Sequence, residues 1–130
     1  MKKILVIDDE PQVRALLNIR LTANGFKVLE AGDGLSGIAL AREERPDLIL
    51  LDILMPGHDG VEIYHALMQD PVTKGVPVIF LTALARNISL TKHSLELGES
   101  YAILGKPYNP QELLQEIQRA VGDPILKEER

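Results

Sequence analysis

Short apolar runs alternate with longer amphipathic segments along the whole chain. Five of these runs have the length and composition of β-strands, and they are Lys3–Ile7, Lys27–Glu30, Asp47–Leu51, Pro77–Leu81 and Tyr101–Leu104. The first, third and fourth are almost wholly apolar, which is typical of strands covered by helices on both faces. The second is short and mixed in polarity, so it predicts an edge strand. Strands that alternate with helices in this way predict an α/β domain with a parallel sheet.

Helical periodicity fills the intervals between the predicted strands. Val13, Leu16, Leu17 and Leu21 recur at helical spacing before Gly25, which ends that helix. Further predicted helices are Leu35–Glu44, a segment that starts at Asp59, a segment around Ile88–Leu97, and a last helix that follows Asn109. The last helix is the best marked, because Asn109, Pro110 and Glu112 have the order of an N-cap, a first-turn proline and a capping-box glutamate.

The size and composition of the chain fit one globular domain. We expect residues 1–122 to form that domain, and residues 123–130 to be a frayed tail or a linker remnant. The net charge is −5 and no dense basic run exists, which argues against direct nucleic-acid binding. No apolar segment approaches the roughly 20 residues of a membrane helix, so we expect a cytoplasmic protein without membrane insertion. The absence of cysteine excludes disulfides and thiolate catalysis.

Charged residues follow three of the predicted strands. Asp8 and Asp9 come after the first strand, Asp52 after the third, and Lys106 after the fifth. The carboxyl ends of parallel strands meet at one edge of the sheet, which is where such folds bind ligands. Three carboxylates there repel one another, and a divalent cation such as Mg²⁺ would relieve that repulsion. The pattern predicts Mg²⁺-assisted phosphoryl chemistry with an aspartate as acceptor and the lysine as counter-charge.

Each of these residues has a plainer interpretation when it is taken alone. Acidic residues at strand ends are often solvated loop residues, and a lone lysine is usually a surface residue; their combination favours the functional interpretation. Glu10 is compatible with the water shell of a metal and equally with a charge at a helix N-terminus. His58, His65 and His93 lack the spacing of metal ligands, so we expect them on the surface.

Five sequence motifs in order resemble the receiver domain of two-component response regulators, the CheY-like family. They are Val6–Glu10, Asp47–Asp52, Met55–Gly60, Pro77–Ala83 and Lys106–Tyr108, and the similarity runs from Lys2 to about Val121. The resemblance implies a flavodoxin-like (βα)5 fold with a five-stranded parallel sheet in the order 2-1-3-4-5.

The resemblance also implies a role for six residues. Asp52 matches the phospho-accepting aspartate. Asp8 and Asp9 match the acidic pair that binds Mg²⁺ together with Asp52, and Leu54 matches the position whose backbone carbonyl completes the metal site. Thr82 matches the hydroxyl residue that meets the phosphoryl group, and Lys106 matches the lysine that contacts the same group from the other side.

The implied function is a phosphorylation switch that catalyses only its own phosphorylation and slow dephosphorylation. A sensor histidine kinase or a phosphotransfer protein would donate the phosphoryl group, and a downstream protein would bind the fourth predicted helix, the fifth strand and the last helix. The protein would be a monomer or a weak, phosphorylation-linked dimer. Two alternatives stay open within the family: a phosphate shuttle in a phosphorelay, and a receiver module cut from a longer regulator or hybrid kinase.

Other classes fit the residues less well. A hydrolase of the haloacid dehalogenase type would need a second aspartate two residues after Asp52, where the chain has Leu54. A dinucleotide-binding protein would need a glycine-rich turn after the first strand, where the chain has Asp8–Pro11. A flavin-binding protein is compatible with the fold alone, and a scaffold that works without phosphorylation would not need an intact acidic cluster.

The sequence departs from the family pattern at two places. Members often carry an aromatic residue three positions before the lysine, and this chain has Ile103 there. Either Ile103 replaces the switch aromatic, or a β-bulge re-aims Tyr101 into its role. Leu54 and Leu84 stand two residues after Asp52 and Thr82. Neither can position a hydrolytic water, so we expect slow self-dephosphorylation.

Overall fold

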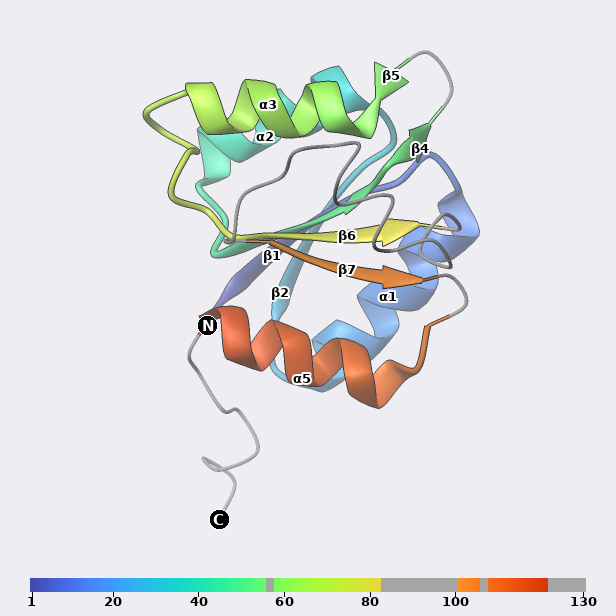
Figure 1. Cartoon of the computed structure of the whole chain (residues 1–130). Helices are drawn as coiled ribbons and strands as arrows, with labels where there is room; N and C mark the ends of the chain where they lie inside the picture. The colour runs from blue at the N-terminus through green and yellow to red at the C-terminus, as the bar shows by residue number, and fades with distance from the viewer. Residues whose placement is uncertain (56–57, 83–100, 106–107, 122–130) are drawn as a thin grey trace.

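A computed structural model describes residues 1–55, 58–82, 101–105 and 108–121 of the chain. Its centre is a parallel sheet of five strands, ordered β2-β1-β3-β6-β7 (Figure 1). These strands are β1 (Lys3–Ile7), β2 (Lys27–Ala31), β3 (Leu48–Asp52), β6 (Val78–Thr82) and β7 (Tyr101–Gly105). Counted along the chain, the order is 2-1-3-4-5, which confirms the predicted topology. Strand β2 lies at an edge, as its mixed polarity predicted.

Helices cover both faces of the sheet (Figure 1). They are α1 (Pro11–Ala23), α2 (Gly34–Glu44), α3 (Gly60–Gln69) and α5 (Pro110–Val121). Helices α2 and α3 lie on one face, while α1 and α5 lie on the other. The helix predicted around Ile88–Leu97 falls outside the described residues, as does the tail 123–130. Within the described ranges, no helix has both the length and the apolar character needed to cross a bilayer.

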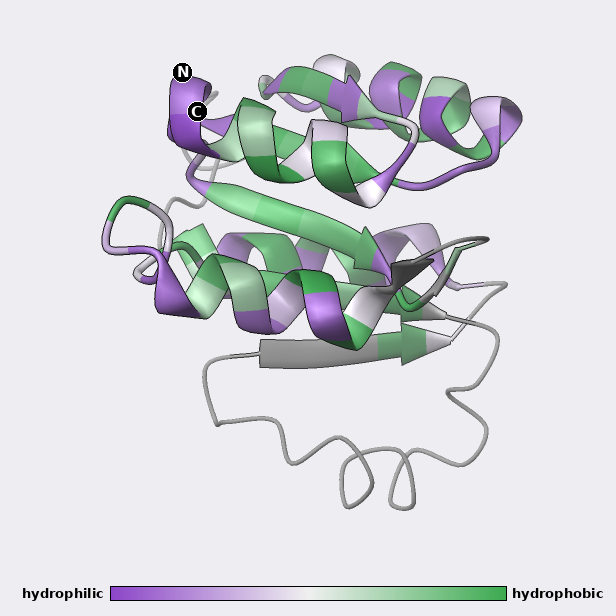
Figure 2. Cartoon of the chain, turned by 90° about the horizontal axis from the view of Figure 1, so that it is seen from above, coloured by the Kyte–Doolittle hydropathy of each residue, from purple (hydrophilic) through white to green (hydrophobic). Residues whose placement is uncertain are grey.

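The hydrophobic core consists of two layers, one on each side of the sheet. Successive residues of a strand point to opposite faces. Leu5, Ile49 and Phe80 therefore join the layer under α2 and α3, while Val6 and Leu50 join the layer under α1 and α5. Both layers need apolar side chains, which is why β1, β3 and β6 are apolar at nearly every position. Figure 2 shows a hydrophobic strand between helices of mixed hydropathy.

The helix ends follow the signals in the sequence. Asn109 Oδ1 accepts hydrogen bonds from the backbone N–H groups of Gln111 at 2.8 Å and Glu112 at 3.3 Å, which confirms the predicted cap of α5. Asp33 caps α2 in the same way by accepting from the N–H of Ser36 at 2.8 Å. Helix α2 ends at Glu44, as predicted, and Arg45 then adopts a left-handed conformation with φ of 49°.

Two features differ from the sequence-based expectations. A short antiparallel pair, β4 (Leu54–Met55) with β5 (His58–Asp59), follows the sheet strand β3, and α3 begins one residue after Asp59. Two-residue strands are held by backbone pairing alone, so no side-chain periodicity predicts them.

In α1, Leu17 and Leu21 are buried as expected, but Leu16 is 46% exposed. Leu16 lies on the flank of the buried stripe, because one residue turns a helix by about 100°.

Candidate functional site at the carboxyl edge of the sheet

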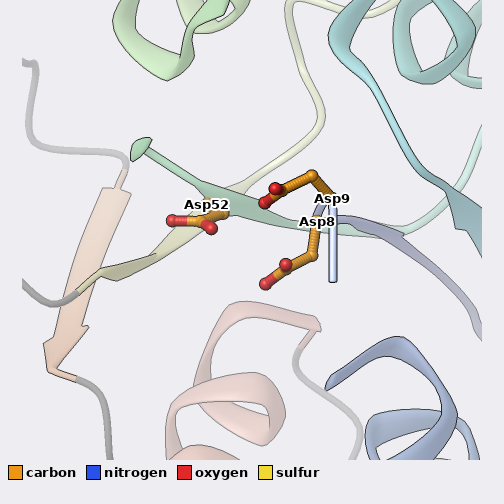
Figure 3. A group of neighbouring side chains, drawn as sticks. All are labelled: Asp8, Asp9 and Asp52. Carbon is orange, nitrogen blue, oxygen red and sulfur yellow. The ribbon is translucent and has the colours of Figure 1, made fainter. Parts of the chain in front are cut away.

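Three aspartates meet where β1 and β3 end. Ile7 pairs with Leu51 in neighbouring strands, so Asp8 and Asp52 are the next residues of the two strands at the same level of the sheet. Asp9 follows directly. Each of the three side chains offers an oxygen, and these oxygens all lie within 4.8 Å of one another. Figure 3 shows the carboxyl groups of Asp8, Asp9 and Asp52 gathered on one side of the strand ends. The predicted acidic cluster is therefore confirmed as a spatial group.

Burial makes this cluster energetically demanding. Asp8 is 2% exposed and Asp52 is 5% exposed, while Asp9 is partly exposed. Carboxylates removed from water need compensating charge or hydrogen bonds. Gathering three of them adds mutual repulsion to that desolvation. A protein gains nothing in stability from such an arrangement, so the cluster indicates a binding function.

The N-cap residue of α1 helps to orient Asp8. Asp8 Oδ1 accepts a hydrogen bond from the N–H of Glu10 at 2.9 Å, and the N–H of Asp8 donates to the carbonyl of Ala31 at 3.1 Å. Glu10 is the N-cap residue of α1, and its side chain makes no cap hydrogen bond. The backbone of Glu10, through its N–H, is therefore what contacts the site residue Asp8. The role of the Glu10 carboxylate stays a prediction.

Gly60 brings the start of α3 against the exit of β3. Its N–H donates to the carbonyl of Ile53 at 2.9 Å. A Cβ atom at position 60 would lie 2.5 Å from the Cα of Ile53 and 2.6 Å from the carbonyl oxygen of Asp52. Real side chains do not approach backbone atoms so closely, so only glycine fits beside Asp52. Gly60 ends the Met55–Gly60 motif, but nothing in the sequence signals this contact.

The remaining predicted site residues are placed only in part. Thr82 ends β6, whose Leu81 pairs with Asp52, so the backbone of Thr82 reaches the same edge of the sheet. Leu54 begins β4 and pairs with Asp59. Lys106 lies outside the described residues, directly after Gly105, which pairs with Thr82. The roles of Thr82, Leu54 and Lys106 therefore stay predictions.

Two further expectations concern residues outside the aspartate cluster. The pairing of β6 with β7 is regular from Tyr101 to Gly105. No β-bulge interrupts this stretch, so that route for re-aiming Tyr101 is not found there. His65 is exposed, as expected of a surface histidine. The side chains of His58 and His93 fall outside the described part of the chain.

The chemistry of the cluster fits a hard divalent cation. Carboxylate oxygens are the ligands that Mg²⁺ prefers, and Mg²⁺ keeps several waters beside a few protein oxygens. Asp8, Asp9 and Asp52 offer such oxygens within one ion's reach of each other. The residues present therefore fit Mg²⁺. When bound, the ion would supply the positive charge that offsets the carboxylates and draws in an anionic group.

Comparison with known proteins places this site in a family. The model of the response regulator receiver domain matches residues 4–118. Among curated proteins, the DNA-binding response regulator MtrA of Mycolicibacterium smegmatis is 36% identical over 117 residues, which is 90% of this chain and 49% of MtrA. The chain thus spans about half the length of the curated relatives it matches.

Solved structures agree with this placement. The chemotaxis protein CheY4 of Vibrio cholerae is 30% identical with a TM-score of 0.81, covering 92% of this chain and 98% of that one. The receiver domain of the sensor histidine kinase PA1611 from Pseudomonas aeruginosa is 28% identical with a TM-score of 0.82, covering 94% and 98%. That structure holds a magnesium ion in its active-site cleft. The sheet order, the acidic cluster and the family model together show that this chain belongs to the response regulator receiver domain family.

Proposed function

We propose that this domain accepts a phosphoryl group on Asp52 from a phosphohistidine of a sensor histidine kinase or a phosphotransfer protein, in a Mg²⁺-dependent reaction. The observation that carries the proposal is the buried carboxylate of Asp52 within 4.8 Å of oxygens from Asp8 and Asp9. Burial of a single aspartate costs free energy but does not by itself indicate a binding site. Three that converge at the ligand-binding edge of a parallel sheet form a site for a cation and an anionic group.

The proposed reaction is a direct phosphoryl transfer. One oxygen of the Asp52 carboxylate attacks phosphorus, the P–N bond to the histidine ring breaks, and a C–O–P linkage forms. The histidine nitrogen keeps the bonding electron pair and takes a proton from solvent. Asp8 and Asp9 would hold the cation together with Asp52, and the ion, when bound, would supply positive charge that offsets the negative charge of the transferred group. Asp52 itself is held in place by β3 and by the close approach of Gly60.

Three further residues have proposed roles around the transferred group. The Leu54 carbonyl would complete the metal site, the Thr82 hydroxyl would donate to a phosphoryl oxygen, and Lys106 would supply a positive charge. Their support is topological. Thr82 ends the strand beside Asp52, and Lys106 follows the residue that pairs with Thr82. The new charge would then bias the surface of the fourth predicted helix, β7 and α5 towards a downstream protein.

A second candidate function has an observation of its own. The curated relatives of the MtrA type are about twice as long as the matched region, which favours a receiver module within a longer regulator. CheY4, by contrast, is matched over 98% of its chain, which favours a receiver that acts alone. The genomic reading frame distinguishes the two. A phosphate shuttle is distinguished by transfer from the phosphorylated chain to a histidine phosphotransfer protein.

Intact mass after incubation with acetyl phosphate tests the proposal. We expect one added phosphoryl group with Mg²⁺ and none with EDTA. Asp52→Asn should abolish the gain. Asp47→Asn is the matched control, because Asp47 precedes the same strand at its opposite end. After removal of the donor, the same samples should lose the group slowly. Equal phosphorylation of the Asp52→Asn variant and the unaltered chain would refute the assignment.

A further inference from the structure

Arg14 connects α1 to the backbone of the acidic cluster. Its Nη1 donates a hydrogen bond of 2.7 Å to the carbonyl oxygen of Asp8. Its Nε donates to Glu30 Oε1 at 3.3 Å, at the end of β2. The arginine side chain is only 20% exposed. One guanidinium therefore joins the peptide between Asp8 and Asp9 to the neighbouring strand.

The space for this guanidinium depends on Gly32. A Cβ atom at position 32 would lie 3.1 Å from Nη1 of Arg14 and 3.6 Å from Cζ. Such a contact is tighter than side chains normally accept, so the guanidinium would have to shift by a few tenths of an ångström. The backbone of Gly32 is not in the left-handed region. Glycine at this position thus leaves room for Arg14 and is not required by the turn.

The far side of Arg14 is held by a chain of hydrogen bonds. Asn18 Nδ2 donates to Glu30 Oε2 at 2.8 Å, while Thr22 Oγ1 donates to Asn18 Oδ1 at 3.0 Å. The Glu30 carboxylate thus accepts hydrogen bonds from both Arg14 and Asn18, which lie one turn apart on α1. Each exposed bond adds little stability alone. Together they restrict where the Glu30 carboxylate, and hence the guanidinium of Arg14, can lie.

The Asp8–Asp9 peptide needs such a restraint, because β1 ends at Ile7. Asp8 is anchored by its N–H to Ala31 and by its side chain to the N–H of Glu10. Its carbonyl is anchored by Arg14, and that carbonyl belongs to the peptide from which Asp9 projects. Rotation of this peptide would move the Asp9 carboxylate away from Asp8 and Asp52.

We propose that Arg14 is a positioning residue, which fixes the Asp8–Asp9 peptide and so aims the carboxylate of Asp9 at the Mg²⁺ position. The proposal rests on the metal site of the proposed function. The charge of Arg14 acts in the opposite sense, since a cation nearby repels Mg²⁺. Geometry and charge therefore predict opposite effects on Mg²⁺ affinity when Arg14 is replaced, and this makes the proposal testable.

Calorimetric titration of the unphosphorylated chain with MgCl₂ measures that affinity. Hydrogen-bond partners of metal ligands typically contribute 10–100-fold in affinity. We expect Arg14→Gln to weaken binding about tenfold, at the lower end of that range because the network is partly exposed. Arg14→Lys keeps the charge but lacks the planar fork that reaches two acceptors, so it should show an intermediate loss.

Gly32→Ala provides a variant in which the charge of Arg14 is untouched. It should weaken Mg²⁺ binding by a smaller factor than Arg14→Gln, since it only displaces the guanidinium. Gly75→Ala is its matched control, because a Cβ there meets nothing within 4 Å, and it should bind Mg²⁺ as the unaltered chain does. Urea unfolding of each variant distinguishes a positioning role from a merely structural one. A merely structural role would lower stability and leave the Mg²⁺ affinity of the folded chain unchanged.

Three outcomes would overturn the proposal: Arg14→Gln that binds Mg²⁺ equally or more tightly, Gly32→Ala that binds like the unaltered chain, or no Mg²⁺ binding by the unaltered chain. Phosphorylation by acetyl phosphate at saturating Mg²⁺ judges the proposed function separately. Normal phosphorylation with unchanged affinities would refute only the role of Arg14. If the variants bind Mg²⁺ in the predicted order but the unaltered chain is not phosphorylated, only the acceptor role of Asp52 would be refuted.

Discussion

Acidic residues have opposite surroundings at the two edges of the sheet. At the amino edge, the N–H of Lys3 donates to Asp47 Oδ2 at 2.8 Å, and Lys3 Nζ lies 3.4 Å from Glu44 Oε1. Arg42 pairs with Asp70 at the same edge, after α3 has returned across the sheet. At the carboxyl edge, Asp8, Asp9 and Asp52 converge on one another. The acidic residues at the amino edge stabilise the folded state through their partners, whereas the three aspartates at the carboxyl edge repel one another and lower its stability.

This contrast explains why the sign of a mutational effect should depend on the edge. A paired carboxylate stabilises the folded state through its partner, so its loss lowers stability. A carboxylate among other carboxylates raises the free energy of the folded state until a cation binds. Stability without metal, stability with metal and phosphorylation therefore distinguish the two kinds of acid, although their residue type is the same.

The largest expected effect is the dependence of stability on Mg²⁺. A ligand at 100 times its dissociation constant adds about 2.7 kcal/mol to the free energy of unfolding. We expect this gain in the unaltered chain and in Asp47→Asn, and a much smaller gain at the same Mg²⁺ concentration in Asp9→Asn. In EDTA, Asp9→Asn should be the more stable of the two variants. Urea unfolding followed by circular dichroism measures both quantities, and a full Mg²⁺ gain in Asp9→Asn would contradict the metal role of Asp9.

A second effect concerns glycines at the two edges. Gly60→Ala forces a Cβ against the backbone of Ile53 and Asp52, so we expect a loss of about 2 kcal/mol, typical of overpacking, together with slower phosphorylation. Gly75 precedes β6 at the amino edge and has open space around it. Gly75→Ala should leave phosphorylation unchanged and leave stability equal or slightly higher. Phosphorylation of Gly60→Ala at the unaltered rate would show that Asp52 does not depend on this contact.

The sequence predicted most of the fold because the buried strands carry a strong signal. Lys3–Ile7 was predicted with its observed ends, and the other strands shifted by a residue at one end or both. Asp52 and Thr82 belong to strands through backbone pairing, although their polarity excluded them from the apolar runs. The pair β4–β5 was missed, because backbone pairing over two residues leaves no pattern in the side chains.

The site was predictable where topology alone determines it. Parallel strands bring the residues after β1 and β3 together, so Asp8, Asp9 and Asp52 could be grouped from their place in the sequence. The contacts of Arg14 and Gly60 could not, because they depend on how α1 and α3 lie against the sheet. The only sequence signal was indirect. A glycine directly after β2, at Gly32, marks a close approach, but nothing in the chain says that an arginine makes it.

The smallest expected effect is the pH dependence of the Arg42–Asp70 pair. The N–H of Val72, which donates to Asp70 at 2.9 Å, and then the Arg42 guanidinium hold the pKa of Asp70 below its ordinary value of 3.8. The unfolded chain therefore binds the proton more tightly, so the contribution of Asp70 to stability is complete well above pH 3.8 and is lost as pH falls through the lower native pKa. Asp70→Asn should be slightly less stable than the unaltered chain at neutral pH and equal to it in acid. Arg42→Gln removes the ion pair but keeps the hydrogen bond from Val72 to Asp70. When Arg42 is replaced, the difference in stability at neutral pH between chains with Asp70 and with Asp70→Asn should therefore be smaller, but it should not vanish. Urea unfolding across this pH range measures the difference, and a gap that persists at the acid end would mean that Asp70 acts through packing instead of charge.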